Sequence, residues 1–143
     1  MSLDHLFLDS QAVPVLVEVK RSTDTRIRRE VVGQMIDYAA SAVKYWPVER
    51  LRTLVEQAAV KDDDAEQALG LFFSEDVDQD RFWRAVEQNL RSGVRLIFLA
   101  DRLPEELVRV IEFLNEQMRD TEVLGVEVPQ YTGAGGHVEV FLT

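Results

Sequence analysis

Two apolar segments near the amino terminus are separated by only three residues, and this spacing limits the possible folds more than any other feature. The segments are Leu3–Asp9 and Val13–Lys20, and the second (VPVLVEVK) is rich in β-branched residues. Pro14 is compatible with a strand because it stands near its start. The link Ser10-Gln11-Ala12 is too short for a crossover between parallel strands, so we expect an antiparallel hairpin.

Helical patterns follow the hairpin. Candidate N-cap residues at 22–25 precede a helix expected over Arg26–Tyr45, and Trp46-Pro47 ends it. A charged turn is expected at Lys61–Asp64. The other predicted helices cover Val48–Val60, Ala65–Leu71, Asp78–Arg91 and about Leu103–Met118.

Three more strands are predicted. Val94–Ala100 is nearly all apolar, which is typical of a strand buried on both faces. Glu122–Val128 and His137–Leu142 are the others, with a glycine-rich turn at Tyr131–Gly136. The strand–helix–strand order over Val94–Val128, together with the hairpin, predicts an α/β fold with a mixed central sheet flanked by helices. We expect one domain over residues 1–143.

Composition excludes several classes of site. The chain has 143 residues, no cysteine and two histidines, so disulfides, thiolate metal sites and a typical zinc cage are excluded. No apolar run is as long as a membrane span and no signal-peptide pattern is present, so a cytoplasmic protein is expected.

Charge is unevenly distributed along the chain. The formal net charge is −10, yet residues 1–52 carry eight basic and seven acidic side chains. Five basic residues lie within ten positions: Lys20, Arg21, Arg26, Arg28 and Arg29. They could form a modest phosphate-facing patch or simply a solvated loop and helix start, and the sequence leaves both interpretations open.

The hairpin brings three charged residues together. If its turn is centred near Gln11, residues whose numbers sum to 22 lie opposite each other, which pairs Asp4 with Glu18. Because side chains alternate along a strand, Glu18 and Lys20 share a face with Asp4. Two facing carboxylates favour a hard divalent cation, Mg²⁺ or Mn²⁺. The alternative is a structural salt bridge, which on these three residues alone is the more common explanation.

Such a cluster contains the parts needed to hydrolyse a phosphodiester. The metal could lower the pKa of a bound water, and the lysine could offset charge on the phosphate. The next predicted helix adds Gln34 and Tyr38, which share one face because they are four residues apart. The ordered set Asp4, Glu18-Val-Lys20 and Gln34-Met-Ile-Asp-Tyr38 resembles the PD-(D/E)xK nuclease superfamily, and is most similar to its RecB-like branch.

The resemblance implies a restriction-endonuclease-like core and a role for each residue. Asp4 and Glu18 would hold Mg²⁺ or Mn²⁺, Lys20 would assist catalysis, and Gln34 and Tyr38 would position nucleic acid and active-site groups. Arg21 and Arg26, both in the basic run, are further candidates for nucleic-acid support. The expected partner is nucleic acid, with DNA favoured, in a prokaryotic DNA-processing or defence protein.

The family core normally starts with a helix and a strand before the aspartate, and the chain lacks both. We therefore expect a piece of a longer protein, with an exposed sheet edge that would allow a homodimer and with activity that truncation could abolish. The alternative function is an inactive nuclease-like domain that binds nucleic acid or assembles proteins.

Other candidates are weaker. Asp9 could replace Asp4 in a different register, but its place beside the turn favours a role in stabilising that turn. His5 alternates to the face opposite Asp4. Gly133, Gly135 and Gly136 lack the strand-to-helix setting of a phosphate loop, and Asp62–Asp64 lacks the spacing of a calcium loop.

Overall fold

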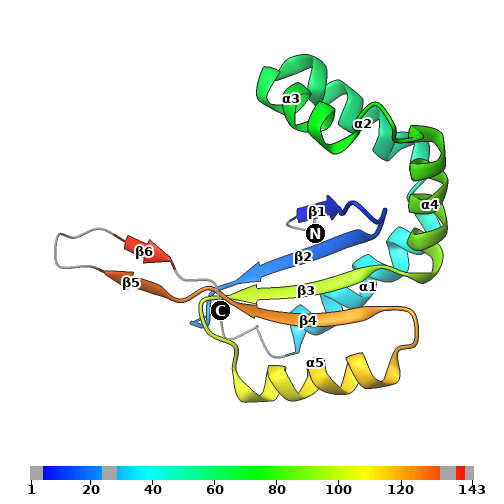
Figure 1. The fold of residues 1–143 in the computed structure, drawn as a ribbon. Helices are drawn as coiled ribbons and strands as arrows, with labels where there is room; N and C mark the ends of the chain where they lie inside the picture. Colours follow the sequence, from blue (N-terminus) through cyan, green and yellow to red (C-terminus); the bar gives the residue numbers. More distant parts are fainter. Residues whose placement is uncertain (1–4, 24–28, 133–137, 141–143) are drawn as a thin grey trace.

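The computed structural model describes residues 5–23, 29–132 and 138–140 of the chain. It is an α/β fold in which a four-stranded mixed sheet has the strand order β1-β2-β3-β4 (Figure 1). The strands are β1 His5–Leu8, β2 Pro14–Lys20, β3 Arg95–Ala100, β4 Glu122–Glu127, β5 Gln130–Thr132 and β6 Val138–Val140. The helices are α1 Glu30–Tyr45, α2 Val48–Lys61, α3 Asp63–Phe72, α4 Gln79–Ser92 and α5 Glu105–Gln117.

The predicted hairpin and its register are confirmed. β1 and β2 are antiparallel, and their paired residues run from His5 with Val17 to Leu8 with Pro14, so that each pair sums to 22. Leu6 pairs with Leu16, which places β1 side chains of even number on the same face as Leu16. Asp4, the next residue in that series, lies outside the described residues.

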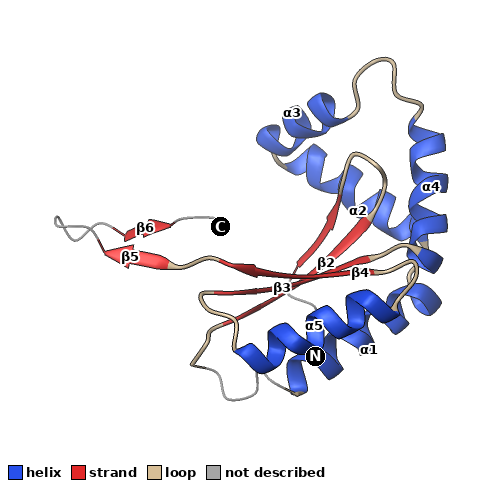
Figure 2. Ribbon diagram, turned by 60° about the horizontal axis from the view of Figure 1, so that its bottom comes forward, coloured by secondary structure: helices blue, strands red, loops and turns tan. Residues whose placement is uncertain are grey.

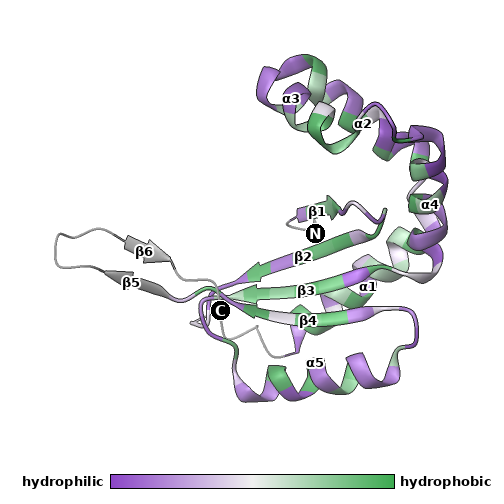
Figure 3. Cartoon of the chain, viewed as in Figure 1, coloured by the Kyte–Doolittle hydropathy of each residue, from purple (hydrophilic) through white to green (hydrophobic). Residues whose placement is uncertain are grey.

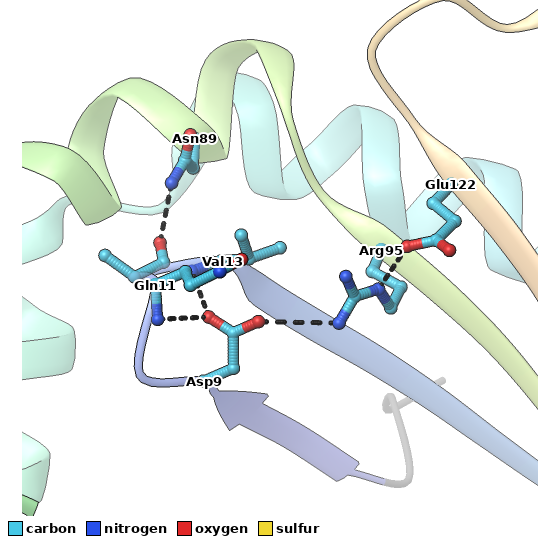
Figure 4. Close-up of polar contacts among 7 residues, drawn as sticks. Asp9, Gln11, Val13, Asn89, Arg95 and Glu122 are labelled. Atoms are coloured by element: carbon cyan, nitrogen blue, oxygen red, sulfur yellow. Dashed lines mark hydrogen bonds and ion pairs between the residues drawn. The ribbon is translucent and has the colours of Figure 1, made fainter.

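Asp9 stabilises the link between the two strands. Its Oδ1 accepts hydrogen bonds from the backbone amides of Gln11 (2.9 Å) and Val13 (2.8 Å), and its Oδ2 pairs with Arg95 at 3.4 Å (Figure 4). Ala12 adopts a left-handed φ of 62°, and its carbonyl accepts a hydrogen bond from Asn89 of α4. These contacts hold a conformation that costs a non-glycine residue free energy.

The rest of the sheet is parallel. β2 pairs with β3 and β3 with β4, so Glu18, Phe98 and Gly125 form one row across three strands. Each parallel pair is joined through helices, and α1 and α5 cover the same side of the sheet (Figure 2). The core on that side is built from Leu16, Leu96, Phe98, Ala100 and Val123 against Val31, Met35, Leu107 and Ile111.

β3 differs from its prediction. Its burial alternates, with Leu96, Phe98 and Ala100 buried and Ile97 and Leu99 only half-buried. The expectation of a strand buried on both faces is therefore wrong for the face that carries Ile97 and Leu99. The apolar run instead has one face packed under the helices, while its other face is covered less completely.

Two local boundaries also differ from the sequence prediction. α2 continues to Lys61 and α3 begins at Asp63, so the expected four-residue charged turn shrinks to Asp62. The Asp62 side chain accepts a hydrogen bond from the Asp64 amide, which caps α3, and acidic residues suit the first turn of a helix. Tyr131 and Thr132 belong to β5 rather than to a turn.

Candidate active site

Glu18 lies at the carboxyl-terminal half of β2 and is the one charged residue that is buried among the described residues, at 2% exposure. It faces the side of the sheet that α1 and α5 cover, in the row that contains Phe98. Burial of a carboxylate costs free energy unless partners satisfy it. The sequence predicted which face Glu18 would occupy, but its burial comes from residues far away in the chain.

Lys20 is the partner of Glu18. Its Nζ lies 3.1 Å from Glu18 Oε1, and its side chain remains 25% exposed because it stands at the end of the strand. The other oxygen, Glu18 Oε2, is fully buried and has no hydrogen-bond partner among the described residues. Among the described residues, only one of the two oxygens of this buried carboxylate therefore has a partner.

The walls around the pair are apolar. The side chains around Glu18 and Lys20 include Val31 of α1, Phe98 and Ala100 of β3, Leu103 just before α5 and Leu107 in its first turn. The space between these side chains is too small for a water molecule. Glu18 would have to turn toward the open end of β2, where Lys20 reaches solvent, to contact a ligand.

Asp101 holds the segment after Lys20 in place through hydrogen bonds from Ser22. The sequence did not predict this residue. Its Oδ1 accepts a hydrogen bond from the Ser22 amide (2.7 Å) and its Oδ2 one from the Ser22 hydroxyl (2.9 Å). The Ser22 amide is the main reason that the pKa of Asp101 lies below its ordinary value. The sequence signal that could have identified Asp101 is its position directly after the buried strand β3.

Glu127 has a similar structural role at the end of β4. Its Oε1 accepts a hydrogen bond from the Leu103 amide at 2.8 Å, and the Val128 amide donates to the Ala100 carbonyl at 2.8 Å. Asp101 and Glu127 are thus both engaged by backbone groups. Within the described part of the chain, no group of three or more histidine, aspartate or glutamate side chains is arranged to hold a metal ion.

The two candidate residues of α1, Gln34 and Tyr38, differ in burial. Tyr38 is buried in the hydrophobic core, whereas Gln34 is partly exposed on the same helix. The residue that α1 contributes to the wall beside Glu18 is Val31, at the beginning of the helix. The helical spacing of Gln34 and Tyr38 is confirmed, but their role toward a ligand stays a prediction.

The remaining predicted residues are only partly described. Asp4 and Arg26 lie outside the described residues, so the complete proposed cluster is not in view. Arg21 is exposed directly after Lys20. His5 is exposed and stacks on Phe7, and Asp9 has the turn-stabilising role that its position predicted.

Comparison of the chain with protein-family models, with curated proteins and with solved structures found no match. None of the helices in the described ranges combines the length and apolar character needed to cross a bilayer.

Proposed function

We propose that this chain carries a site for divalent-metal-dependent hydrolysis of phosphodiester bonds in nucleic acid, with DNA as the expected polymer. The observation that supports the proposal best is the half-satisfied carboxylate of Glu18 beside Lys20. A purely structural ion pair would gain more stability if both carboxylate oxygens were hydrogen-bonded. The unused oxygen fits a residue that is kept for a ligand.

The β1–β2 register supplies the second argument. Extended by one pair beyond His5 and Val17, it predicts Asp4 opposite Glu18, and Asp4 itself lies outside the described residues. Glu18 and Asp4 would then be the ligands of the metal, with oxygen donors that suit Mg²⁺ or Mn²⁺. When bound, such a cation would stabilise charge on a phosphate oxygen and lower the pKa of a bound water.

Lys20 has a separate role in this proposal. Its Nζ is held by Glu18 Oε1 at the solvent-accessible end of the strand, where the ammonium can offset charge that develops on a phosphate. The hydrogen bonds of Asp101 to Ser22 fix the backbone two residues beyond Lys20. Asp101 is therefore a positioning residue, and exposed Arg21 is available for a phosphate contact.

Calorimetric titration with Mn²⁺ tests the metal site. We expect the wild-type protein to bind Mn²⁺, and the Glu18→Gln and Asp4→Asn proteins to bind it at least about tenfold more weakly, since each loses a charged ligand. Asp9→Asn is the matched control, because Asp9 is a carboxylate on the same hairpin that is already engaged by the turn. Equal Mn²⁺ affinity in all four proteins would exclude the site.

Cleavage of single- and double-stranded DNA in the presence of Mg²⁺ or Mn²⁺ tests the reaction, with RNA as the comparison substrate. The proposal expects a DNA product that disappears in the Glu18→Gln protein and persists in Asp9→Asn. Metal binding combined with tight nucleic-acid binding and no cleavage of either polymer would contradict hydrolysis.

A further inference from the structure

A large apolar cleft lies away from Glu18, between the β1 edge of the sheet and the α2–α3 hairpin. Its volume is about 540 Å³, and every side chain that lines it is aliphatic or aromatic. β1 contributes Leu6, Phe7 and Leu8, and residues of α2, α3 and α4 form the opposite side. In Figure 1, β1 lies at the edge of the sheet and the α2–α3 hairpin lies across from it.

Several apolar side chains that line this cleft are exposed to solvent, unlike those of a closed hydrophobic core. Phe7 is 57% exposed and Leu54 is 52% exposed, and α3 contains no buried residue. Figure 3 shows hydrophobic positions interspersed with hydrophilic ones along α2 and α3. The positions that line the cleft recur at helical spacing, so each helix presents an apolar side to it: Leu51, Leu54, Val55 and Ala58 of α2, and Ala65, Ala68, Leu69 and Phe72 of α3. A contiguous exposed apolar surface of this kind in a folded protein marks a binding site for another molecule.

Charge indicates what kind of molecule fits. Residues 62–80, which include α3, carry eight acidic and no basic side chains. Asp63, Asp64 and Glu66 are exposed on the helix that forms one wall. These carboxylates do not line the apolar cleft itself, but the acidic segment beside it repels nucleic acid and attracts lysine and arginine. A second copy in a symmetric dimer would place its own acidic segment against this one, which is unfavourable.

The β1 edge indicates how the molecule binds. β1 is hydrogen-bonded to β2 on one side and is the outer strand of the described four-stranded sheet. An edge strand presents backbone amides and carbonyls to which an extended chain can be added. We propose that the cleft binds an extended apolar segment of a partner protein, flanked by lysine or arginine, which pairs with β1.

Synthetic peptides test this proposal directly. The probe is a peptide with alternating valine and threonine and two lysines at each end, and the matched control carries glutamates at the ends. We expect the lysine peptide to bind at least about tenfold more tightly by calorimetry, because its terminal charges complement the acidic segment beside the cleft. A lysine peptide with methylated backbone amides should lose that affinity, since it cannot pair as a strand. Equal binding of the lysine and glutamate peptides, or no loss on methylation, would overturn the proposal.

Two substitutions on one helix locate the binding. Leu54→Asp removes an apolar contact and puts a carboxylate against the apolar middle of the peptide, away from its terminal lysines, so it should weaken binding at least about tenfold. Val60→Asp should have no effect. Val60 is also on α2 and is 87% exposed, but it does not line the cleft. Both side chains are exposed, so both variants should fold, and circular dichroism checks this. Equal affinity in the two variants would contradict the proposal.

Light scattering of the wild type and of Leu54→Asp distinguishes a partner protein from a second copy. The proposal expects a monomer in both. Concentration-dependent association that Leu54→Asp abolishes would show that a second copy occupies the cleft, and would overturn the assignment to a basic partner. None of these substitutions touches Glu18 or Lys20, so the outcome is independent of the proposed hydrolase site.

Discussion

Asp9 and Glu18 stand near opposite ends of β2, and the fold treats their carboxylates differently. Asp9 uses Oδ1 for two backbone amides and Oδ2 for Arg95, and its side chain is 28% exposed. Glu18 is almost completely buried, pairs with Lys20 through one oxygen and has no described partner for the other. Asp9, which water can reach more easily, has partners for both of its carboxylate oxygens, whereas buried Glu18 has a described partner for only one.

This difference separates a structural acid from a candidate functional one. Hydrogen bonds to a charged group stabilise a fold by about 1.5–3 kcal/mol each, whereas a buried polar atom without a partner costs about 1–3 kcal/mol. Asp9 therefore contributes to stability. The unpaired oxygen of buried Glu18 lowers the stability of the fold, and ligand-binding sites commonly carry such a cost in stability.

The largest effect is expected for Lys20→Met. This change keeps the aliphatic packing but leaves the buried Glu18 carboxylate without its cation, so the free energy of unfolding should fall by about 3 kcal/mol. Metal-dependent cleavage should be lost in the same protein. Urea denaturation and a cleavage assay on one preparation measure both quantities, and exposed Arg21→Met is the control, expected within about 0.5 kcal/mol of wild type.

The double variant Glu18→Met and Lys20→Met sharpens that comparison. Because it removes both charges together, its stability should return to within about 1 kcal/mol of wild type or exceed it. A double variant as unstable as Lys20→Met would mean that the pair is itself a stabilising feature. A Lys20→Met protein that cleaves DNA at the wild-type rate would exclude the catalytic role.

A smaller effect of about 2 kcal/mol is expected for Asp9→Ala, because its side chain is 28% exposed and water offsets part of the lost interactions. The substitution removes two amide hydrogen bonds to a charged acceptor and the pair with Arg95, and it weakens the turn that holds Ala12 at positive φ. Thermal unfolding measures the loss, and Ser10→Ala, an exposed neighbour in the turn, is the control. Mn²⁺ affinity should be the same in Asp9→Ala as in the wild type. A loss of Mn²⁺ affinity in this variant would instead show that Asp9 is part of the metal site.

The smallest effect concerns Asp101 and pH. The Ser22 amide keeps the pKa of Asp101 below its ordinary value of 3.8, so the contact adds stability above that pH and loses it as the pH falls through the lowered pKa. Near neutral pH the wild type should therefore unfold at a slightly higher temperature than Asp101→Asn. The difference should shrink in acid below about pH 3.8, and a difference that grows in acid would contradict this sign.

Much of the fold could be predicted from local patterns. The short link and the side-chain alternation determined the hairpin and its register, because strand pairing across a tight turn leaves few alternatives. Pro47 separated α1 from α2, and α4 begins one residue after its predicted start at Asp78, which caps the helix. The β3–α5–β4 unit also followed from a strand–helix–strand pattern that begins with the nearly continuous apolar run Val94–Ala100. These features depend on residues close together in the chain.

Tertiary structure decided the properties on which the site depends. The burial of Glu18 comes from Val31, Phe98 and Leu107, which no spacing within β2 reveals. The contact between Ser22 and Asp101 joins residues 79 positions apart. The cleft beside β1 likewise requires α2 and α3 to face a strand far away in the sequence. The sequence by itself determined which residues share a strand face and where most elements end, because those depend on local geometry. Only the tertiary structure decided which charge is buried and which apolar surface is left open, because both depend on packing between distant segments.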